Sequence, residues 1–149
     1  GTAGYFAGGY PRVATVDKFA FPGDSRSTLG TGLSAARAEL AGIANSGTAG
    51  YFGGGKEASG NVATVDKFAF SDDSRTTLGT GLSTARNGMA GMANSGTAGY
   101  FGGGTINVSF ADQTTVDKFA FSDDSRTTLG TGLSAARSTL AAMANSGTL

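Results

Sequence analysis

Apolar and polar residues alternate most clearly at 64–70. One face of an extended chain would carry Thr64, Asp66, Phe68 and Phe70, and the other would carry Val65, Lys67 and Ala69. A two-residue period is that of a β-strand with distinct faces. The segment is therefore predicted to be a strand.

The residues around this segment predict a unit of four short strands, at about 38–45, 48–53, 64–70 and 75–83. Asn45 and Gly47 supply the positive-φ residues of a tight hairpin between the first two. The acidic stretch 71–74 reads as another turn. Because all connections are short, neighbouring strands are expected to pair as an antiparallel meander.

The stretch 33–41 also has respectable helix propensity, which gives an alternative interpretation. It runs directly into Gly42 and the hairpin turn, however, and the unit's length suits four strands. The strand interpretation is favoured.

The whole unit occurs three times. Thr-Val-Asp-Lys-Phe-Ala-Phe recurs at 15–21, 64–70 and 115–121, and Leu-Gly-Thr-Gly-Leu-Ser recurs at 29–34, 78–83 and 129–134. We expect one repeat domain over 1–149, with units at about 1–37 plus a completing strand, 38–86 and 87–137, and a closing strand at 138–149.

Three features mark each unit. In the second copy, Arg37 precedes the first strand, the segment 51–55 joins Tyr-Phe to Gly-Gly-Gly, and Val-Asp-Lys-Phe begins at Val65. These features resemble the kelch repeat, a four-stranded β-propeller blade. The likeness covers nearly the whole chain, although Leu29, Leu78 and Leu129 stand where kelch blades usually carry Trp. The resemblance implies an all-β propeller of four-stranded antiparallel blades, three per chain.

Three blades do not close a ring, because propellers typically have four to eight. The chain begins at a predicted second strand, 1–7, and ends at a predicted first strand, 138–146, so its ends are complementary. We predict a homodimer in which a second chain closes a six-bladed ring. Three chains and nine blades are the less favoured alternative.

Composition narrows the possible functions. Eleven Lys+Arg balance eleven Asp+Glu, so no basic field predicts a nucleic-acid partner. No apolar run approaches the roughly 18 residues of a membrane span. The chain has no Cys and no His, which removes thiol and imidazole catalysts and the usual zinc ligands. The sequence predicts no enzyme, cofactor, metal site, membrane partner or nucleic-acid partner.

The copies differ mainly in one loop, at 10–14, 56–63 and 105–114. Equivalent loops of propeller blades emerge on one face, which is often the binding face of repeat proteins. Neutral drift in tolerant loops is an equally open interpretation. The candidate ligand-binding residues are Tyr10, Arg12, Lys56, Glu57, Asn61, Asn107, Phe110, Asp112 and Gln113.

Other repeated residues are interpreted as structural. The Asp-Asp-Ser-Arg turns resemble calcium ligands, but two carboxylates are too few, and a turn capped by its own Asp is favoured. The recurring arginines, Arg37, Arg86 and Arg137, are expected to brace backbone carbonyls rather than bind an acidic ligand. The phenylalanines, Phe6, Phe19 and Phe21 in the first copy, are expected to fill the space between blades.

The expected function is a non-catalytic scaffold or recognition module that presents its variable loops to a protein or glycan. The alternative is a purely structural repeat segment of a fibre or virion protein, or a designed or excised propeller fragment.

Overall fold

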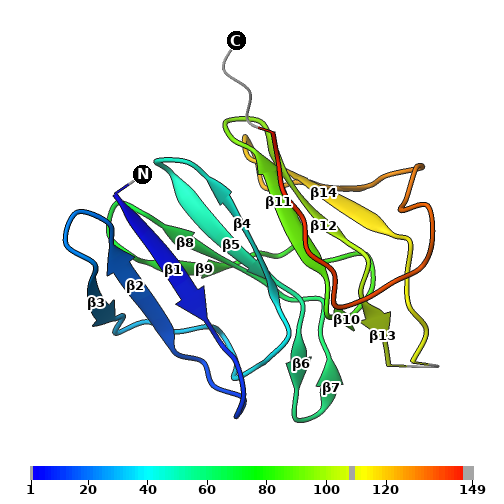
Figure 1. Ribbon diagram of the computed structural model, residues 1–149, viewed down its shortest axis with the longest axis horizontal. Coiled ribbons are helices and arrows are strands. Elements are labelled where there is room, and N and C mark those ends of the chain that lie inside the picture. Colours follow the sequence, from blue (N-terminus) through cyan, green and yellow to red (C-terminus); the bar gives the residue numbers. More distant parts are fainter. Residues whose placement is uncertain (1, 108–109, 146–149) are drawn as a thin grey trace.

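The computed structural model describes residues 2–107 and 110–145, and within these ranges it contains fifteen strands and no helix (Figure 1). The all-β prediction is confirmed, and the helical alternative for 33–41 is wrong for this chain. Every strand pairing is antiparallel, and none of the sheets is closed in the described part of the chain.

Three larger sheets follow one another along the chain. Sheet I is ordered β1 (Ala3–Ala7), β2 (Val16–Ala20) and β3 (Ser25–Thr28). Sheet II is ordered β4 (Ala41–Asn45), β5 (Ala49–Gly53), β8 (Val65–Ala69) and β9 (Arg75–Thr77). Sheet III is ordered β11 (Ala90–Asn94), β12 (Ala98–Gly102), β14 (Val116–Ala120) and β15 (Arg126–Thr128).

Two small ribbons involve the variable loops. One pairs β6 (Lys56–Glu57) with β7 (Gly60–Asn61), and the other pairs β10 (Arg86–Asn87) with β13 (Thr105–Ile106).

Sheets II and III have the same strand order and the same register. Tyr51 lies opposite Lys67 in sheet II, as Tyr100 lies opposite Lys118 in sheet III. In sheet I the equivalent pair is Tyr5 and Lys18. The repeated sequence therefore folds into a repeated sheet, and sheet I lacks only the strand that β4 and β11 provide in the others.

The predicted fourth strand at 75–83 is too long, because β9 ends at Thr77. Leu78 still donates its N–H to the carbonyl of Val65, and Leu82 donates to that of Ala63. Between them Gly81 lies so close to the Ala63 carbonyl that a Cβ would stand 2.4 Å from its oxygen. The chain thus follows its neighbour at close range without a regular ladder.

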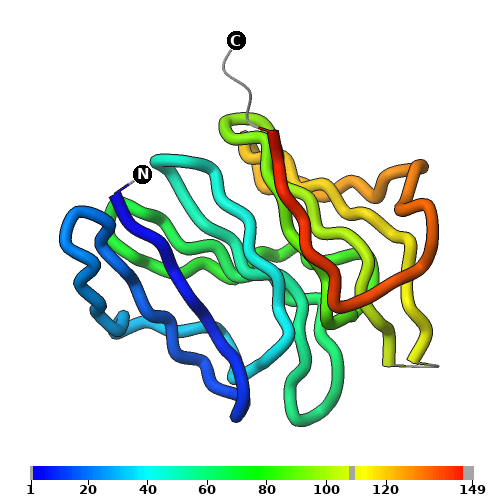
Figure 2. Tube along the Cα trace, viewed as in Figure 1, coloured from blue at the N-terminus to red at the C-terminus, as the bar shows by residue number. Residues whose placement is uncertain are grey.

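The predicted closing strand is also absent from the described residues. Residues 138–145 form no strand, and 146 lies outside the described ranges. This segment (red in Figure 2) runs beside sheet III, where Leu140 and Ala141 face Ala90 and Met92. A strand needs a partner edge, and the edge with the matching sequence, β1, lies at the opposite end of this chain.

The core lies between the sheets. β4 of sheet II packs against β11 and β12 of sheet III, with Ile43 filling the space above Gly91 and Gly99. Phe101 is completely buried and rests against Gly53 of sheet II. These strand positions require glycine, because the backbone and large side chains of the neighbouring sheet leave no room for a Cβ.

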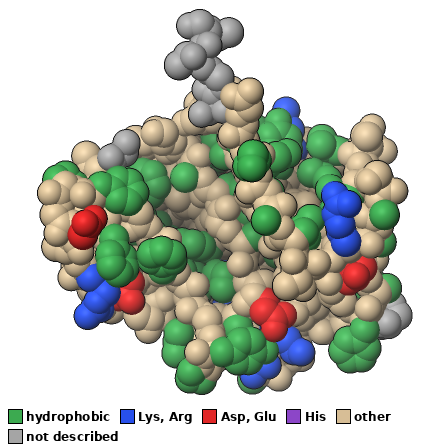
Figure 3. All heavy atoms as spheres, in the orientation of Figure 1, with side chains coloured by type: hydrophobic (Ala, Val, Ile, Leu, Met, Phe, Trp, Pro, Cys, Tyr) green, Lys and Arg blue, Asp and Glu red, His purple; other side chains and the backbone are tan. Residues whose placement is uncertain are grey.

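The expectation that the phenylalanines fill the space between sheets is met in the middle of the chain and not in sheet I. Phe68 and Phe119 are buried, whereas Phe6 is 70% exposed and Phe21 is 57% exposed. Their copies Phe101 and Phe121 in sheet III are buried and Phe52 and Phe70 in sheet II are half-buried, whereas sheet I has no sheet before it in this chain. Apolar side chains accordingly gather on parts of the surface in Figure 3.

Candidate functional site

The three variable loops are held by the same hydrogen bonds. At their starts, the N–H groups of Gly9, Gly55 and Gly104 donate to the carbonyls of Arg37, Arg86 and Arg137 at 3.1, 3.0 and 3.0 Å. At their ends, the carbonyls of Ala14, Ala63 and Thr114 accept from Leu33, Leu82 and Leu133 at 2.7, 2.8 and 2.7 Å. Each loop is therefore an insertion between fixed points on a repeated frame.

All three loops leave the sheets at one edge of the molecule. β6, β7, β10 and β13 lie together along the lower edge in Figure 1, and the β4–β5 hairpin turn lies at the opposite edge. The second and third loops touch each other: a Cβ added at Gly60 would be 2.4 Å from Nδ2 of Asn107. We call this surface the loop face, consisting of residues 10–14, 38–39, 56–63, 87–88, 105–107 and 110–114.

A row of polar contacts crosses the loop face from the first copy to the third. The Tyr10 hydroxyl donates to Oε1 of Glu39 at 3.1 Å, and the Asn87 amide donates to the other carboxylate oxygen. Asn61 Nδ2 donates to Oδ1 of Asn87 at 3.0 Å and to the carbonyl of Thr105 at 2.8 Å. The row joins parts of the chain that lie up to 95 residues apart in the printed sequence.

The first and second loops place their remaining candidates around this row. The Arg12 guanidinium stands 5.5 Å from the Tyr10 ring centroid. Lys56 pairs through its backbone with Ala38, and Glu57 pairs with Gly60 across the β6–β7 hairpin. These side chains are half-buried, whereas Tyr10 is 65% exposed.

The third loop places its candidates at the end of the row, although its residues 108–109 lie outside the described ranges. Phe110 is 82% exposed. Asp112 accepts a hydrogen bond from Thr105 Oγ1 at 2.7 Å, which lowers the pKa of its carboxyl. The Gln113 amide donates to the carbonyl of Ala111 at 3.0 Å. Asn107 is exposed beside Gly60.

Three residues of the row are not among the sequence candidates: Thr105, which lies in the third loop, and Glu39 and Asn87, which lie outside the loops. Glu39 and Asn87 follow the repeated arginines, where the copies read Ala-Glu, Asn-Gly and Ser-Thr from 38, 87 and 138. This second, shorter point of variation was the available signal. In the sequence it belongs to the predicted first strand of each unit rather than to the loops, so it does not stand out as part of the site.

The repeated arginines serve the frame. Arg37 and Arg86 are completely buried, and their Nη2 atoms donate to Asp66 and Asp117 at 2.9 and 2.8 Å. They also donate to backbone carbonyls, Arg37 to that of Phe52 at 3.3 Å. The expected bracing of carbonyls is confirmed at both positions, and the aspartate partners are an addition to it.

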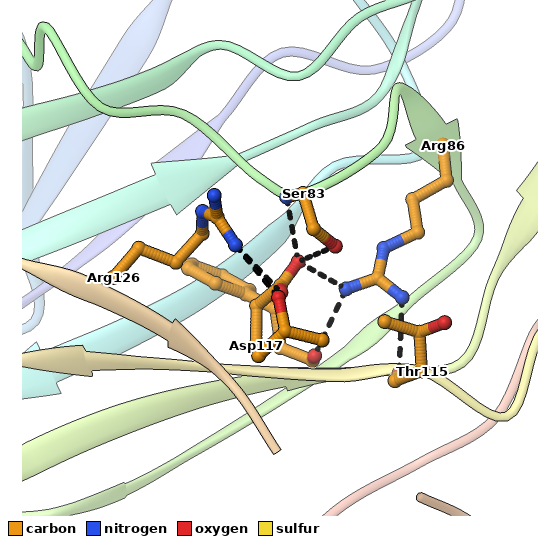
Figure 4. A network of polar contacts seen from close by, with 7 residues as sticks. Ser83, Arg86, Thr115, Asp117 and Arg126 are labelled. Carbon is orange, nitrogen blue, oxygen red and sulfur yellow. Dashed lines mark hydrogen bonds and ion pairs between the residues drawn. The ribbon is translucent and has the colours of Figure 1, made fainter. Parts of the chain in front are cut away.

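Figure 4 shows the network around Asp117, into which Ser83, Arg86 and Arg126 point. The Ser83 backbone N–H and hydroxyl each donate to Oδ2 of Asp117 at 2.9 Å. Arg86 Nη1 donates to the carbonyl of Thr115 at 2.9 Å. Because the carboxylate is buried, these donors replace the water that it loses.

The same network surrounds Asp66 in sheet II. Desolvation by burial opposes its ionisation, but hydrogen bonds from Thr77 and Ser34 and the charge of Arg37 outweigh desolvation and lower the pKa of Asp66. Burial lowers the pKa of Arg86, against the attraction of Asp117. Both Arg–Asp pairs connect the segment that leaves one sheet to the third strand of the next.

A second repeated network joins the sheets near the acidic turns. Tyr51 Oη and Lys67 Nζ of sheet II both reach Asp124 of sheet III, at 2.8 and 2.7 Å. Burial, followed by the hydrogen bond to Asp124, raises the pKa of Tyr51. Local sequence patterns do not predict this role, because Asp124 lies 73 residues from Tyr51.

The first aspartate of each complete acidic turn caps its own backbone, as predicted. Asp72 accepts from the N–H of Ser74 at 3.0 Å, and Asp123 accepts from that of Ser125 at 3.0 Å. Among the described residues, no three His, Cys, Asp or Glu side chains gather as potential metal ligands, and no helix is long and apolar enough to cross a membrane.

Comparison with protein-family models and with curated proteins finds no match for this chain.

Proposed function

We propose that this chain is a non-catalytic recognition module built as part of a kelch-like β-propeller, and that the loop face is its binding surface. The observation that carries the proposal is the polar row from Tyr10 through Glu39, Asn87 and Asn61 to Thr105. It connects the loops that differ between copies into one surface, while the repeated residues form the frame beneath.

Several features support the propeller arrangement. Sheets II and III have equal strand order and register, and their first strands, β4 and β11, pack against each other. Four-stranded antiparallel meanders that follow one another around an axis are the blades of a propeller. Each segment between sheets carries an arginine that anchors it to the following sheet, at Arg37 and Arg86.

The chemistry of the loop face favours a glycan over other ligands. Amide side chains both donate and accept hydrogen bonds, as ligand hydroxyl groups require, and four of them, Asn61, Asn87, Asn107 and Gln113, lie on this face. Exposed aromatic rings, Tyr10 and Phe110, offer apolar surfaces beside them. The face mixes both charge signs, which gives no field for a highly charged ligand.

The test is a printed glycan array probed with the wild-type chain and with a loop graft. In the graft, the residues of loop 56–63 replace 10–14 and 105–114 between the hydrogen bonds that frame each loop. We expect binding to a restricted set of glycans by the wild type and its loss in the graft, with unchanged far-ultraviolet circular dichroism.

Two point variants refine the test. Phe110→Asn removes the exposed ring and suits the positive φ of 49° at this position, and Tyr10→Ser removes the other ring. Each is expected to weaken glycan binding at least tenfold. A blank array with graft-sensitive binding of a protein would assign the loop face to a protein. A blank array without any graft-sensitive binding would refute recognition and favour a structural repeat.

A further inference from the structure

The contacts between sheets I and II recur between sheets II and III, and each set is directional. Tyr5 and Lys18 of sheet I reach Asp73 of sheet II at 2.7 and 2.8 Å. Tyr51 and Lys67 of sheet II reach Asp124 of sheet III in the same way, at 2.8 and 2.7 Å. One sheet supplies a hydroxyl and an ammonium group, and the following sheet supplies a carboxylate.

The third set of these residues lies at the two ends of the chain. Tyr100 and Lys118 on sheet III form no such contact in the described part of the chain, and neither does Asp24 at the turn of sheet I. Asp24 has a φ of 48°, close to the 57° and 59° of Asp73 and Asp124. The acceptor aspartate of sheet I therefore has the left-handed backbone of its occupied copies, although its turn is closed by the Gly23 N–H on the Ala20 carbonyl rather than by the aspartate N–H.

The buried Arg–Asp pairs are divided in the same way. Arg137 has the same backbone contact as its copies, accepting from Gly104 at 3.0 Å, but its side chain is exposed after sheet III. Asp17 on β2 is the copy of Asp66 and Asp117, and its side chain is 32% exposed against 0% for theirs. One end of the chain thus carries the donor and the other end the acceptor.

The exposed apolar side chains and the unpaired strand edge of sheet I also mark this end of the chain as one that lacks a preceding sheet. Phe6 and Phe21 are exposed on sheet I, whereas their copies Phe101 and Phe121 are buried by the preceding sheet. β1 pairs only with β2, so its other edge is open. The copies of β1, which are β5 and β12, have β4 and β11 at that edge.

We propose that a second copy of this chain docks head to tail, with the sheet III end of each copy on the sheet I end of the other. Ser134 and Arg137 of one copy bind Asp17 of the other, and Tyr100 and Lys118 bind Asp24. Residues 141–145 pair with β1, in the register of β4 on β5 that sets Asn45 opposite Ala49. Asn145 then lies opposite Ala3, and Phe6 and Phe21 are covered.

The copy number rests on the propeller arrangement proposed above. Two copies supply six sheets, which is within the four to eight of propellers, whereas three supply nine. A head-to-tail contact that closes after two copies forms a ring with a twofold axis and leaves no free end. Closure also removes the open edge of β1.

Light scattering tests the stoichiometry of the full chain, for which we expect twice 14.7 kDa. Arg137→Ala truncates one partner of a pair that becomes buried, so the dimer dissociation constant should rise about 100-fold or more. The control is Arg12→Ala on the loop face, which should leave the mass unchanged. A wild-type mass of one or three chains, or insensitivity to Arg137→Ala, overturns the proposal.

The register is tested by cross-linking, since the chain has no Cys. A chain with Ala3→Cys and Asn145→Cys places both thiols at directly opposed positions, within the range that a disulfide spans. Oxidation should give a covalent dimer on a non-reducing gel. The control, Ala3→Cys with Ala144→Cys, directs one thiol to the opposite face of the strand and should not cross-link.

Equal cross-linking by both cysteine chains, or by neither, overturns the strand pairing. Glycan binding is a separate readout, because none of these substitutions except the control Arg12→Ala lies on the loop face. A dimer that fails to bind glycans contradicts the proposed function alone, and a glycan-binding monomer contradicts this inference alone.

Discussion

Replacing Arg86 by alanine should strongly destabilise the fold, because Arg86 is a buried charge that pairs with the buried carboxylate of Asp117. The change leaves the buried Asp117 carboxylate without Arg86, although Ser83 and Thr128 still donate to it at 2.9 and 2.7 Å and Arg126 Nη1 lies 3.6 Å from its Oδ1. It also removes the hydrogen bonds that Arg86 donates to the Phe101 and Thr115 carbonyls, of which the Thr115 carbonyl keeps the Gly103 N–H. Breaking a buried ion pair by removing one partner costs about 3–5 kcal/mol.

For a domain of this size, 1 kcal/mol shifts the melting temperature by about 2–4 °C. Arg86→Ala should therefore lower it by roughly 6–20 °C. Urea unfolding followed by far-ultraviolet circular dichroism gives the corresponding free energy, with all variants at one protein concentration. Arg12→Ala is the control, since the Arg12 guanidinium stands beside the exposed Tyr10 ring and forms no ion pair within the described ranges, and it should cost about 0.5 kcal/mol or less.

A double-mutant cycle separates the ion pair from the packing of the arginine side chain. Asp117→Asn alone leaves the guanidinium buried without its charged partner, and we expect a cost of about 3 kcal/mol. The double variant should be at least about 2 kcal/mol more stable than the sum of the two costs predicts. A loss below about 1 kcal/mol for Arg86→Ala, or additive costs in the cycle, would refute this account of the network.

Two further predictions concern pH and a glycine. Folding stability should fall in acid below about pH 4, because the pKa of Asp66 is lower in the folded state than in the unfolded state and its contribution is lost when the carboxylate is protonated. Stability should also fall in alkali above about pH 10, because the pKa values of Tyr51 and Lys67 are raised in the folded state and both groups must then lose their protons. With no His in the chain, melting temperatures should show a plateau between these limits, and a step between pH 6 and 7 would contradict this. Gly81→Ala should cost at least about 2 kcal/mol by thermal unfolding, since its Cβ would stand 2.4 Å from a carbonyl oxygen, whereas Gly79→Ala, with nothing within 4 Å, should be neutral.

The strands could be predicted because their signals are local. Alternation at 64–70 locates β8, and the Asn-Ser-Gly turn at 45–47 locates the hairpin of β4 and β5. The early end of β9 at Thr77 was missed, because it depends on how closely Gly81 approaches the Ala63 carbonyl. Such an approach is a tertiary contact, which the β-strand propensity of the local residues does not predict.

The candidate site was found in part for the same reason. Variation between copies identified the loops, but the row across them depends on Glu39 and Asn87, which lie outside the loops in the sequence. For the buried pairs a signal did exist. Asp66 shares its predicted face with Phe68, and a carboxylate on an apolar face needs a cation. Arg37 recurs in every copy and is a possible cation, but nothing in the sequence pattern predicts that it contacts Asp66.

Burial at the two ends of the chain cannot be predicted from local sequence, because the copies are nearly identical. Asp17, Asp66 and Asp117 stand in the same heptapeptide, yet one side chain is partly exposed and the other two are completely buried. The difference is the presence of a preceding unit, because each carboxylate is covered by the segment that leaves the sheet before it. The repeat that makes this contact twice, in Arg37–Asp66 and Arg86–Asp117, also carries its two halves at Arg137 after sheet III and Asp17 on sheet I.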